Sequence, residues 1–310
     1  MAQETQSAAN CPEPLTVPDG FEWYDLQIAG HHQSVVKNGK RQIGFLKNKS
    51  TGRILKPVQE GLLGSSELGF YNTVFVLRRP EKPNDDTPST ADDPILAELA
   101  PFIPIFYGTN VVPMGETGHL FMQLEDVTAK FHRPCVTDIK IGAQTHDPTA
   151  SQEKIAYEKR KCPQAAQIGF RLLGMKVYDA STLRVISKDK AWGKTLQAEQ
   201  IPSALEGFMV GRNRTYQLRV VESLLQRLHS IAAWFERQRR FHFYSSSLLL
   251  VYEGDEDAAS SSSSDDQLCD VRMIDFTHVF DANTADTNYT YGLDNLIKQF
   301  EALGVKLRKN

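Results

Sequence analysis

Residues Pro134 to Gly142 read PCVTDIKIG, and this stretch decides how the rest of the chain is interpreted. In a β-strand, successive side chains point to opposite faces. One face therefore carries Thr137, Ile139 and Ile141, and the other carries Val136, Asp138 and Lys140. Asp138 and Lys140 point the same way, about 7 Å apart along the strand. The pattern predicts a strand with an apolar face and an opposite face that carries a carboxylate beside an ammonium group.

The composition is typical of a soluble globular protein, with 310 residues of which 41% are hydrophobic and 24% charged. This length allows two lobes with a sizeable core. The net charge of −3 predicts no nucleic-acid partner for the chain as a whole. The longest apolar runs, such as Leu248 to Val251, are far shorter than the roughly 18 to 20 residues of a membrane span, so no transmembrane segment is expected. The N-terminus shows no secretory signal, which indicates an intracellular protein.

The first part of the chain predicts an N-terminal lobe over residues 21–124. Residues 1–20 are polar and proline-containing and are expected to be disordered. Residues 31–60 alternate between apolar and polar types around Asn38-Gly39 and Thr51-Gly52, which predicts an antiparallel meander. A helix is expected over 65–77, capped by Ser65 or Ser66. It would carry Glu67 and bury Leu68, Tyr71 and Phe75.

The second part predicts a C-terminal lobe over 129–310, joined through a hinge at 125–128. A proline-rich acidic loop at 80–94 is expected to be flexible. Helices are expected at 149–162, which Pro163 must end, and at 216–240. Strands are expected at 247–253 and 271–276. Between them, residues 254–267 contain five consecutive serines flanked by acids; they are expected to be disordered, as an inserted hairpin loop or as a phosphorylatable segment.

Three charged positions suggest phosphoryl transfer. The chain contains no GxGxxG, no GxxxxGK[ST] and no HRD triplet, which excludes the common nucleotide motifs. A transferring phosphoryl group needs cations and a carboxylate-held Mg²⁺, which Lys140, Lys56 and the strand-end Asp275 could supply. Each also has an ordinary alternative: a turn residue for Asp275, an exposed strand lysine for Lys140, and an edge-strand charge for Lys56.

A second cationic group is expected on the helix at 149–162. Lys154 and Lys161 are seven residues apart and therefore nearly share one face, with Lys159 and Arg160 close by. Such a group can bind a polyphosphate, although a solvated surface is the common explanation of a charged helix. His278, three residues after Asp275, could add a further donor.

At this point the chain resembles the inositol polyphosphate kinase family, whose PxxxDxKxG signature matches PCVTDIKIG. The segments Glu125-Asp126-Val127, SSLL at 246–249, VYEG at 251–254 and VRMIDFTH at 271–278 are similar to that family's motifs in the same order. The resemblance runs from about residue 30 to the C-terminus. Within the family, GFRLLGMKVYD at 169–179 and YGLDNLI at 291–297 are most similar to the multikinase branch.

The resemblance implies an α+β, two-lobed fold related to protein kinases, with an antiparallel N-lobe sheet, a mixed α+β C-lobe and ATP in the cleft. It implies that Lys56 contacts ATP phosphates and is oriented by Glu67. Glu125 and Val127 would bind adenine through their backbones, and Asp138 would hold the ribose. It implies that Lys140 lies between the γ-phosphate and the attacking hydroxyl. Asp275 and Ser247 would bind Mg²⁺. The phosphates of the inositol substrate would be bound by Lys154, Lys161 and His278.

The implied activity is ATP- and Mg²⁺-dependent phosphorylation of inositol tris- and tetrakisphosphates at the 6- and 3-hydroxyls to pentakisphosphate. The short stretch between Gly142 and Gly169 implies a small, open pocket, which could also accept a phosphoinositide lipid headgroup. Acid Glu158 on the substrate helix departs from the family pattern and is expected to point away from phosphates. We expect a monomer in the nucleus and cytoplasm. Two alternatives are a hexakisphosphate kinase that makes pyrophosphates, and a non-catalytic scaffold or transcriptional adaptor that uses the loops at 80–94 and 255–266.

Overall fold

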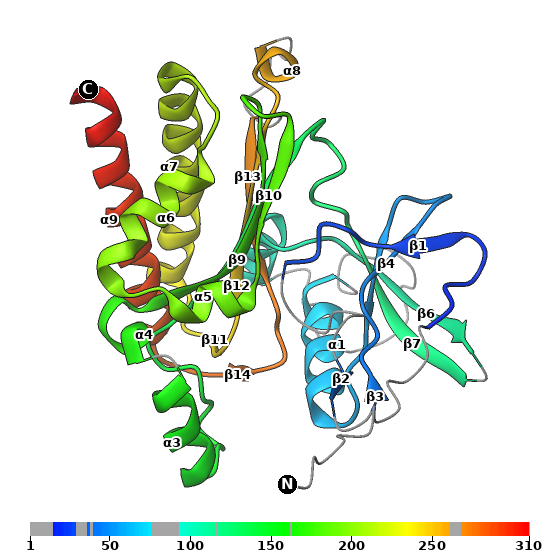
Figure 1. Cartoon of the computed structure of the whole chain (residues 1–310). Helices are drawn as coiled ribbons and strands as arrows, with labels where there is room; N and C mark the ends of the chain where they lie inside the picture. The colour runs from blue at the N-terminus through cyan, green and yellow to red at the C-terminus, as the bar shows by residue number, and fades with distance from the viewer. Residues whose placement is uncertain are drawn as a thin grey trace, which may run out of the picture.

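The computed structural model describes residues 15–28, 36–37, 40–75, 93–115, 117–161, 163–260 and 268–309. These residues form two lobes, with the N-lobe on the right and the C-lobe on the left in Figure 1. Among the residues so described, no helix combines the length and apolar character that crossing a bilayer requires. Most of the expected acidic loop at 80–94, namely residues 80–92, lies outside the described residues.

The N-lobe is built on a five-stranded sheet in which each paired strand runs antiparallel to its neighbour. Its order is β1 (Phe21–Trp23), β4 (Leu46–Asn48), β5 (Ile54–Pro57), β7 (Thr117–Leu124) and β6 (Phe106–Met114). Strands β2 (Val36–Lys37) and β3 (Lys40–Arg41) form a separate pair. Helix α1 (Leu62–Phe75), helix α2 (Pro94–Leu99) and the 3-10 helix η3 (Ala100–Phe102) connect β5 to β6. The expected meander is therefore present in β4 and β5, which turn at Gly52 with a φ of 69°.

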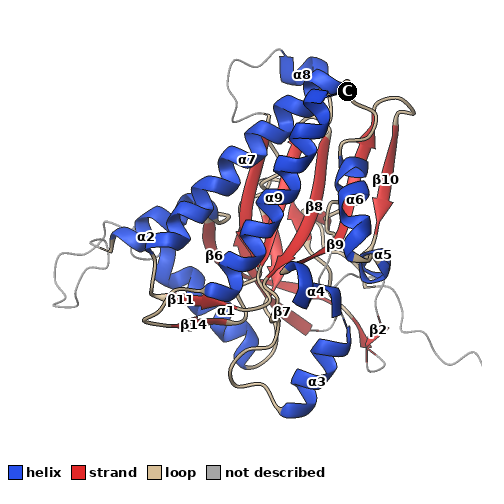
Figure 2. Cartoon of the chain, turned by 90° about the vertical axis from the view of Figure 1, so that its left-hand side faces the viewer, coloured by secondary structure: helices blue, strands red, loops and turns tan. Residues whose placement is uncertain are grey.

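The C-lobe is built on a second five-stranded antiparallel sheet, with helices over one face (Figure 2). Its order is β10 (Arg184–Lys188), β9 (Phe170–Asp179), β8 (Pro134–Ile141), β12 (Ser247–Glu253) and β13 (Cys269–Ile274). The covering helices are α6 (Ile201–Phe208), α7 (Arg214–Arg237) and α9 (Thr287–Lys309). The remaining elements are α3 (Gln152–Lys161), α4 (Pro163–Ile168), α5 (Lys190–Thr195), η4 (Ala198–Gln200), β11 (Phe241–Phe243), α8 (Glu256–Ser260) and β14 (Val279–Asp281).

The expected long helix is present as α7, whose apolar spacing of three and four buries one face. Val221, Leu224, Leu228 and Ile231 are all fully buried against the core. The helix begins at Arg214 because Asn213 caps it through the Tyr216 N–H, and it ends at Arg237, three residues before the expected end. Together with α9 it covers the apolar face of the sheet, so the opposite face of β8 is left to the cleft.

Helix α1 differs from the expectation in its start and in its buried face. It begins at Leu62, and the Ser65 hydroxyl donates to the Leu62 carbonyl within the helix, so neither Ser65 nor Ser66 is the cap. Leu68 and Phe75 are only partly buried, whereas Glu67 is buried. The core side of the helix carries Phe70, Tyr71 and Val74, and Glu67 lies on this side because its carboxylate meets Lys56 of β5 within the N-lobe.

Several sequence-based boundaries are corrected by packing. Leu15 and Val17 pack against the small core of the N-lobe, so the expected disordered start at 1–20 is too long. The segment expected to be disordered at 254–267 begins with the helix α8, whose first turn is held by the Asp255 carboxylate; residues 261–267 lie outside the described residues. Strands β6, β9 and β10 and helices α6 and α9 were not predicted over their full lengths. The strands were missed although β6 and β7 form a hairpin, as do β9 and β10, so each has a partner that is near in the sequence.

Helix α9 approaches the sheet closely at Gly292. A Cβ atom at this position would lie 2.0 Å from the Gly169 carbonyl oxygen and 2.8 Å from the Gly142 nitrogen. Gly142 ends the strand that carries Asp138 and Lys140, and its N–H donates to the Gly169 carbonyl at 2.7 Å. The contact therefore fixes the end of β8.

We predict that Gly292→Ala destabilises the protein by about 1–3 kcal/mol through overpacking. Gly304→Ala, in the same helix, is the matched control, because its Cβ would meet Val221 Cγ1 at an ordinary 3.5 Å. This control should be neutral or stabilising by up to about 1 kcal/mol, since alanine favours helix. Urea unfolding of both variants measures the difference, and equal stability of the two would contradict the close approach.

Candidate active site

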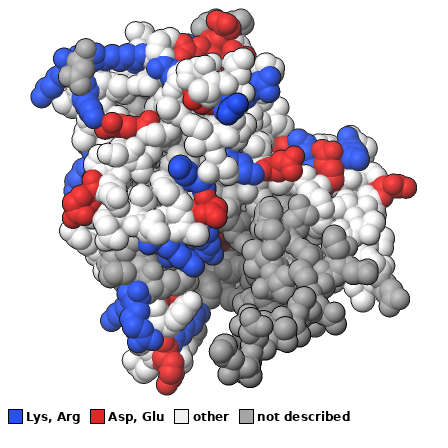
Figure 3. Space-filling model, in the orientation of Figure 1, with Lys and Arg blue, Asp and Glu red and all other residues white. Residues whose placement is uncertain are grey.

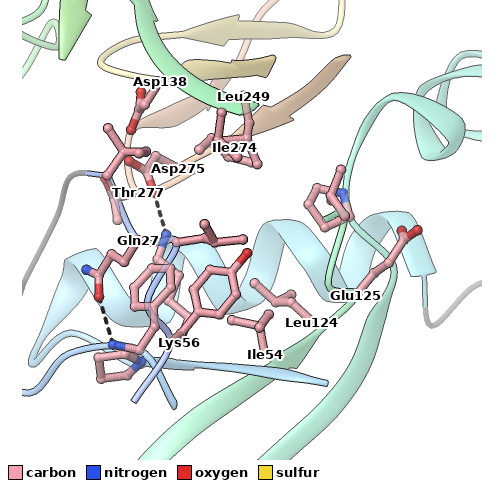
Figure 4. Close-up of a pocket in the computed structure, with 18 of the residues that line it drawn as sticks. Gln27, Ile54, Lys56, Leu124, Glu125, Asp138, Leu249, Ile274, Asp275 and Thr277 are labelled. Carbon is pink, nitrogen blue, oxygen red and sulfur yellow. Dashed lines mark hydrogen bonds and ion pairs between the residues drawn. The ribbon is translucent and has the colours of Figure 1, made fainter. Parts of the chain in front are cut away.

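A cavity of about 430 Å³ lies between the two lobes and brings together most of the predicted site residues. Its walls at one end are apolar, with Ile54 and Leu124 from the N-lobe facing Leu249 and Ile274 from the C-lobe (Figure 4). Two apolar walls separated by a slot suit a flat aromatic ring. The polar groups lie toward the other end, where Asp138, Asp275 and Thr277 appear in the same view.

The hinge supplies backbone groups to the apolar end. The Glu125 N–H donates to the Ile105 carbonyl at 2.9 Å, and the Glu125 carboxylate accepts from the Ile105 N–H at 3.1 Å and lies 3.4 Å from Arg272. Val127 is buried and lines the cavity, and its N–H makes no hydrogen bond to another described residue. The predicted hinge contact to an adenine edge therefore has a donor in place at Val127.

Asp126, which the sequence analysis assigned no role, ties the hinge to the N-lobe. Its buried carboxylate lies 2.8 Å from the Lys47 ammonium group and accepts from the Tyr24 hydroxyl at 3.2 Å. It also accepts from the Thr128 hydroxyl at 2.6 Å. The hinge is thus pinned to both β4 and the segment after β1. Asp126 was hard to recognise as a structural residue from the sequence, because an aspartate two residues before a threonine is typical of any turn.

Lys56 forms two ion pairs, one within the N-lobe and one that connects the N-lobe to the C-lobe. Its ammonium group lies 2.7 Å from Glu67 Oε1 and 2.6 Å from Asp275 Oδ1. Burial alone would lower the pKa of Lys56, but the carboxylates of Asp275 and Glu67 outweigh it and raise that pKa above its ordinary value. Glu67 also accepts from the Phe276 N–H at 3.1 Å. The sequence-based pairing of Lys56 with Glu67 is present in the structure.

Asp275 and its neighbours fit a hard divalent cation. Asp275 has a φ of 64°, a left-handed conformation that aspartate tolerates better than most residues. Burial opposes its charge, yet Lys56 and Lys140 hold the pKa of Asp275 below its ordinary range. Asp138 Oδ1 and Ser247 Oγ are buried oxygens with no hydrogen bond to a described residue. Carboxylate and hydroxyl oxygens suit Mg²⁺, which takes few protein ligands, and no cage of three metal-binding side chains occurs among the described residues.

Asp138 and Lys140 share the face of β8 that lines the cavity, as the alternation of the strand predicts. The Lys140 ammonium group donates to the Ser245 carbonyl. Burial lowers the pKa of Lys140 to about 8, although Asp275 and Asp138 oppose the shift. Burial and the Asp275 carboxylate raise the pKa of Asp138 to about 7, against the effect of Lys140. Both groups are desolvated, which strengthens their interaction with a charged ligand.

Two of the predicted substrate-binding residues, His278 and Lys154, contact Asp147. His278 Nδ1 lies 2.8 Å from Asp147 Oδ2, and the Lys154 ammonium group lies 3.5 Å from the same oxygen. Lys and Arg side chains gather on the protruding helix α3 at the lower left of Figure 3. The side chain of Lys161, at the end of that helix, lies outside the described residues. Glu158 accepts a hydrogen bond from the Thr145 hydroxyl at 3.1 Å, so its carboxylate has a partner within the protein.

Thr277 and Lys190 are among the cavity residues that sequence reasoning missed. Lys190 is the first residue of α5, capped by Asp189 through the Trp192 N–H. The sequence contained a feature that could have identified Lys190. A lysine at the start of a helix is disfavoured because it faces the positive end of the helix dipole, so its presence there indicates another role.

The sequence predicts a helix that Asp147 opens, but α3 begins at Gln152, where the Ser151 hydroxyl accepts from the Lys154 N–H. Asp147 instead accepts from Thr149 in the preceding turn.

Comparison with known proteins shows the fold class and the family of the chain. The structure resembles that of "Inositol Phosphate Multikinase Ipk2 in complex with ADP and Mn2+" from S. cerevisiae, with a TM-score of 0.62 and 24% identity over 81% of this chain and 98% of that chain. The resemblance establishes the two-lobed α+β fold as the fold of an inositol phosphate multikinase. The family profile described as "Inositol polyphosphate kinase" matches residues 121–301, more than half of the chain.

The chain belongs to the inositol polyphosphate kinase family. It is 34% identical to the inositol polyphosphate multikinase of Homo sapiens over 221 residues, which cover 71% of this chain and 48% of the human protein. It is also 34% identical to inositol hexakisphosphate kinase 3 of Mus musculus over 197 residues, 58% of this chain and 50% of that protein. The chain thus spans about half the length of these two relatives. The resemblance seen in the sequence is confirmed.

The contact between Asp147 and His278 predicts a titration effect. Burial lowers the pKa of His278, and the Asp147 carboxylate partly offsets this because it favours the charged imidazolium. In Asp147→Asn that offset is lost while burial and Lys154 remain, so the pKa of His278 should fall further. NMR titration of the imidazole protons measures the pKa of His278. Asp255→Asn, which removes a carboxylate from the exposed His132, is the control and should leave the His278 curve unchanged.

Proposed function

We propose that this protein is an ATP- and Mg²⁺-dependent inositol phosphate kinase of the multikinase type. The observation that carries the proposal is the order of groups along one cavity. Apolar walls and the hinge donor of Val127 lie at one end, Asp138 and Asp275 lie toward the other with Lys56 bound to Asp275, and Lys140 and His278 line the same cavity. This order matches adenine, triphosphate and a phosphorylated acceptor in sequence. The ADP and Mn²⁺ bound to the yeast multikinase support the nucleotide part.

In the proposed reaction, an inositol hydroxyl oxygen attacks the γ-phosphorus in line, the bond to the β,γ-bridging oxygen breaks, and ADP leaves. The hydroxyl proton passes to the phosphate oxygens or to water. Lys56 and Lys140 are placed to neutralise the charge that spreads over the phosphoryl oxygens. Asp275 and Ser247 would hold Mg²⁺, with the Asp138 oxygen within the same cavity. The metal ion, when bound, neutralises the β- and γ-phosphates and orients them.

Inositol tris- and tetrakisphosphates are the proposed substrates, with transfer to the 6- and 3-hydroxyls. Support comes from the short connection between Gly142 and Gly169, which holds the single long helix α3 and the one-and-a-half turns of α4. Among the described residues this connection supplies only α3 and α4, and so short a connection favours acceptance of more than one orientation of the ring. The same short connection supports the proposal that a phosphoinositide lipid headgroup is accepted.

The first test is product analysis after incubation with Mg-ATP and either inositol 1,4,5-trisphosphate or hexakisphosphate. We expect sequential conversion of the trisphosphate to pentakisphosphate, and a loss of at least about a hundredfold in kcat for Asp275→Asn, because removing a preorganised charge costs about 3 kcal/mol or more in the transition state. Asp281→Asn, an exposed aspartate in β14, is the matched control and should keep full activity. If neither substrate is phosphorylated, the proposed kinase activity is wrong and the non-catalytic scaffold or adaptor is favoured.

Lys190 supplies a prediction on substrate charge. Its side chain lies at the phosphate end of the cavity and lowers the pKa of Lys140 from a distance, as a further positive charge does. Lys190→Ala should raise KM for inositol phosphates by about tenfold, the equivalent of one charge-assisted hydrogen bond, with a smaller change in kcat. Lys194→Ala, in the last turn of the same short helix, is the control. Equal KM values for both variants would remove Lys190 from the substrate site.

The second candidate, a hexakisphosphate kinase, rests on the similarity to the mouse enzyme of that name. Such a kinase needs enough cations for a fully phosphorylated ring. Lys140 and Lys190 line the cavity, and Lys154 belongs to the group of lysine and arginine residues on α3. Formation of a pyrophosphate from hexakisphosphate, at a rate above that of trisphosphate phosphorylation, would favour this candidate.

A further inference from the structure

The segment that joins β8 to α3 has no regular structure. Residues 142–151 lie between the end of β8 at Ile141 and the start of α3 at Gln152, and they belong to neither a helix nor a strand. The segment connects Lys140, beside which transfer is proposed, to Lys154 of α3, a helix that projects away from the C-lobe sheet (Figure 2). Because these residues lack the hydrogen bonds of a helix or sheet, their position depends on contacts with other elements.

Asn288 of α9 binds both backbone groups of one residue of this segment. Its Oδ1 accepts from the Gln144 N–H at 2.8 Å, and its Nδ2 donates to the Gln144 carbonyl at 2.9 Å. A side-chain amide that satisfies both groups fixes the residue in position and in orientation. Asn288 is the second residue of α9, and the Asp286 carboxylate caps this helix through the Tyr289 N–H at 2.9 Å. Gln144 is therefore anchored to the long helix that covers the sheet.

Ser245 holds the next residue and also contacts the lysine of β8. Its hydroxyl donates to the Thr145 carbonyl at 2.9 Å, and its own carbonyl accepts from the Lys140 ammonium group. Ser245 lines the active-site cavity and has a φ of 56°, a left-handed conformation that is unfavourable for a residue other than glycine. Strain of this kind persists only where the surroundings impose it, and it is concentrated at functional sites. One serine thus connects Lys140 to the segment that leads to the substrate end.

The two held residues are followed closely by the group that is expected to bind the substrate phosphates. Asp147 comes two residues after Thr145, and its Oδ2 lies 2.8 Å from His278 Nδ1 and 3.5 Å from the Lys154 ammonium group. The placement of the segment relative to Lys140 therefore sets how far these phosphate-binding groups lie from the ammonium group at which transfer is proposed.

This spacing decides which hydroxyl of a bound ring can react. In-line transfer requires reacting atoms about 3–3.5 Å apart, and a displacement of about 1 Å can cost about a hundredfold in rate. Two hydroxyls of one ring compete for that position while the phosphates are held elsewhere. A firmly held segment favours one hydroxyl, whereas a loose segment lets the ring turn and makes the two products more equal.

We propose that Ser245 and Asn288 are positioning residues, which together clamp residues 144–145 and thereby set which hydroxyl of the inositol phosphate is presented for transfer. The inference deepens the proposed kinase function and rests on it. Both side chains act through the segment that joins Lys140 to Asp147, and neither is assigned a contact with the substrate. Loss of either side chain frees the same two residues, so their effects are coupled and not additive.

The first test is the ratio of the tetrakisphosphate isomers formed from inositol 1,4,5-trisphosphate and Mg-ATP. Ser245→Ala and Asn288→Ala should each change the ratio of transfer to the 6- and 3-hydroxyls at least about threefold and raise KM for trisphosphate about fivefold, the effect of one neutral hydrogen bond. KM for ATP should stay unchanged, because the nucleotide end is not altered. The double variant should change the ratio no more than the stronger single variant. A wild-type ratio in both single variants would overturn the inference.

Two matched controls remove neighbouring side chains that make no such bond. Ser246→Ala deletes the buried hydroxyl next to Ser245, whose oxygen makes no hydrogen bond to a described residue. Thr287→Ala changes the exposed residue before Asn288. Both controls should keep the wild-type isomer ratio. A change as large as that in the clamp variants would contradict a specific role for Ser245 and Asn288.

Ser245→Gly separates the hydroxyl from the strained backbone. Glycine adopts a positive φ without steric cost, so this variant loses the hydroxyl and keeps the turn. If the hydroxyl is responsible, Ser245→Gly and Ser245→Ala should give the same isomer ratio. A wild-type ratio in Ser245→Gly beside a changed ratio in Ser245→Ala would assign the effect to strain and overturn the clamp.

Hydrogen exchange of the Gln144 amide reads the clamp without turnover. In Ser245→Ala the partner of this amide, Asn288, is intact, so exchange that is at least about tenfold faster reports more frequent opening of the segment. Calorimetry on the same variant should show weaker binding of trisphosphate. Unchanged exchange would overturn the clamp. If exchange and binding change as expected, but the protein phosphorylates neither trisphosphate nor hexakisphosphate, the clamp is supported and the proposed function is wrong.

Discussion

The ion pairs of Lys56 with Glu67 and Asp275 are the interaction on which the rest of the structure depends. They join the strand β5, the helix α1 that follows it, and Asp275 at the end of the C-lobe strand β13, which is far from both in the sequence. A buried lysine without a carboxylate partner would lose its charge, so each carboxylate stabilises the ammonium group that phosphate binding needs. The same contact closes the cleft on the side opposite the hinge. Lobe arrangement and phosphate chemistry are therefore one constraint.

The hinge is held by a second set of buried charges. Asp126 binds Lys47 and Tyr24 of the N-lobe, and Arg272 connects Glu125 to the buried Asp270 of the C-lobe. Because both lobes are tied at the hinge and again at Lys56, the apolar slot between them keeps its width. A slot of fixed width is what a stacked planar ring requires.

Local patterns predicted much of the site correctly, for identifiable reasons. Strand alternation placed Asp138 and Lys140 on one face of β8, and the structure confirms that both line the cavity. The spacing of α7 predicted its buried face, because a long amphipathic helix carries its own periodicity. Of the three residues that the sequence predicted to be buried in α1, Tyr71 is buried, whereas Leu68 and Phe75 are only partly buried. The buried face contains Phe70, Tyr71 and Val74, and Glu67 lies on the same face because it pairs with Lys56.

The sequence by itself determined the strand whose one face carries Asp138 and Lys140, the buried stripe of the long helix and, through its resemblance, the family. These depend on residues adjacent in the chain or one turn apart. Tertiary structure alone decided that Asp147 joins His278 to Lys154, that Lys190 enters the cavity, and that Gly292 packs on Gly142 and Gly169. Each of these contacts joins segments far apart in the sequence. Their geometry is set by how two sheets and their helices pack, and no local propensity encodes it.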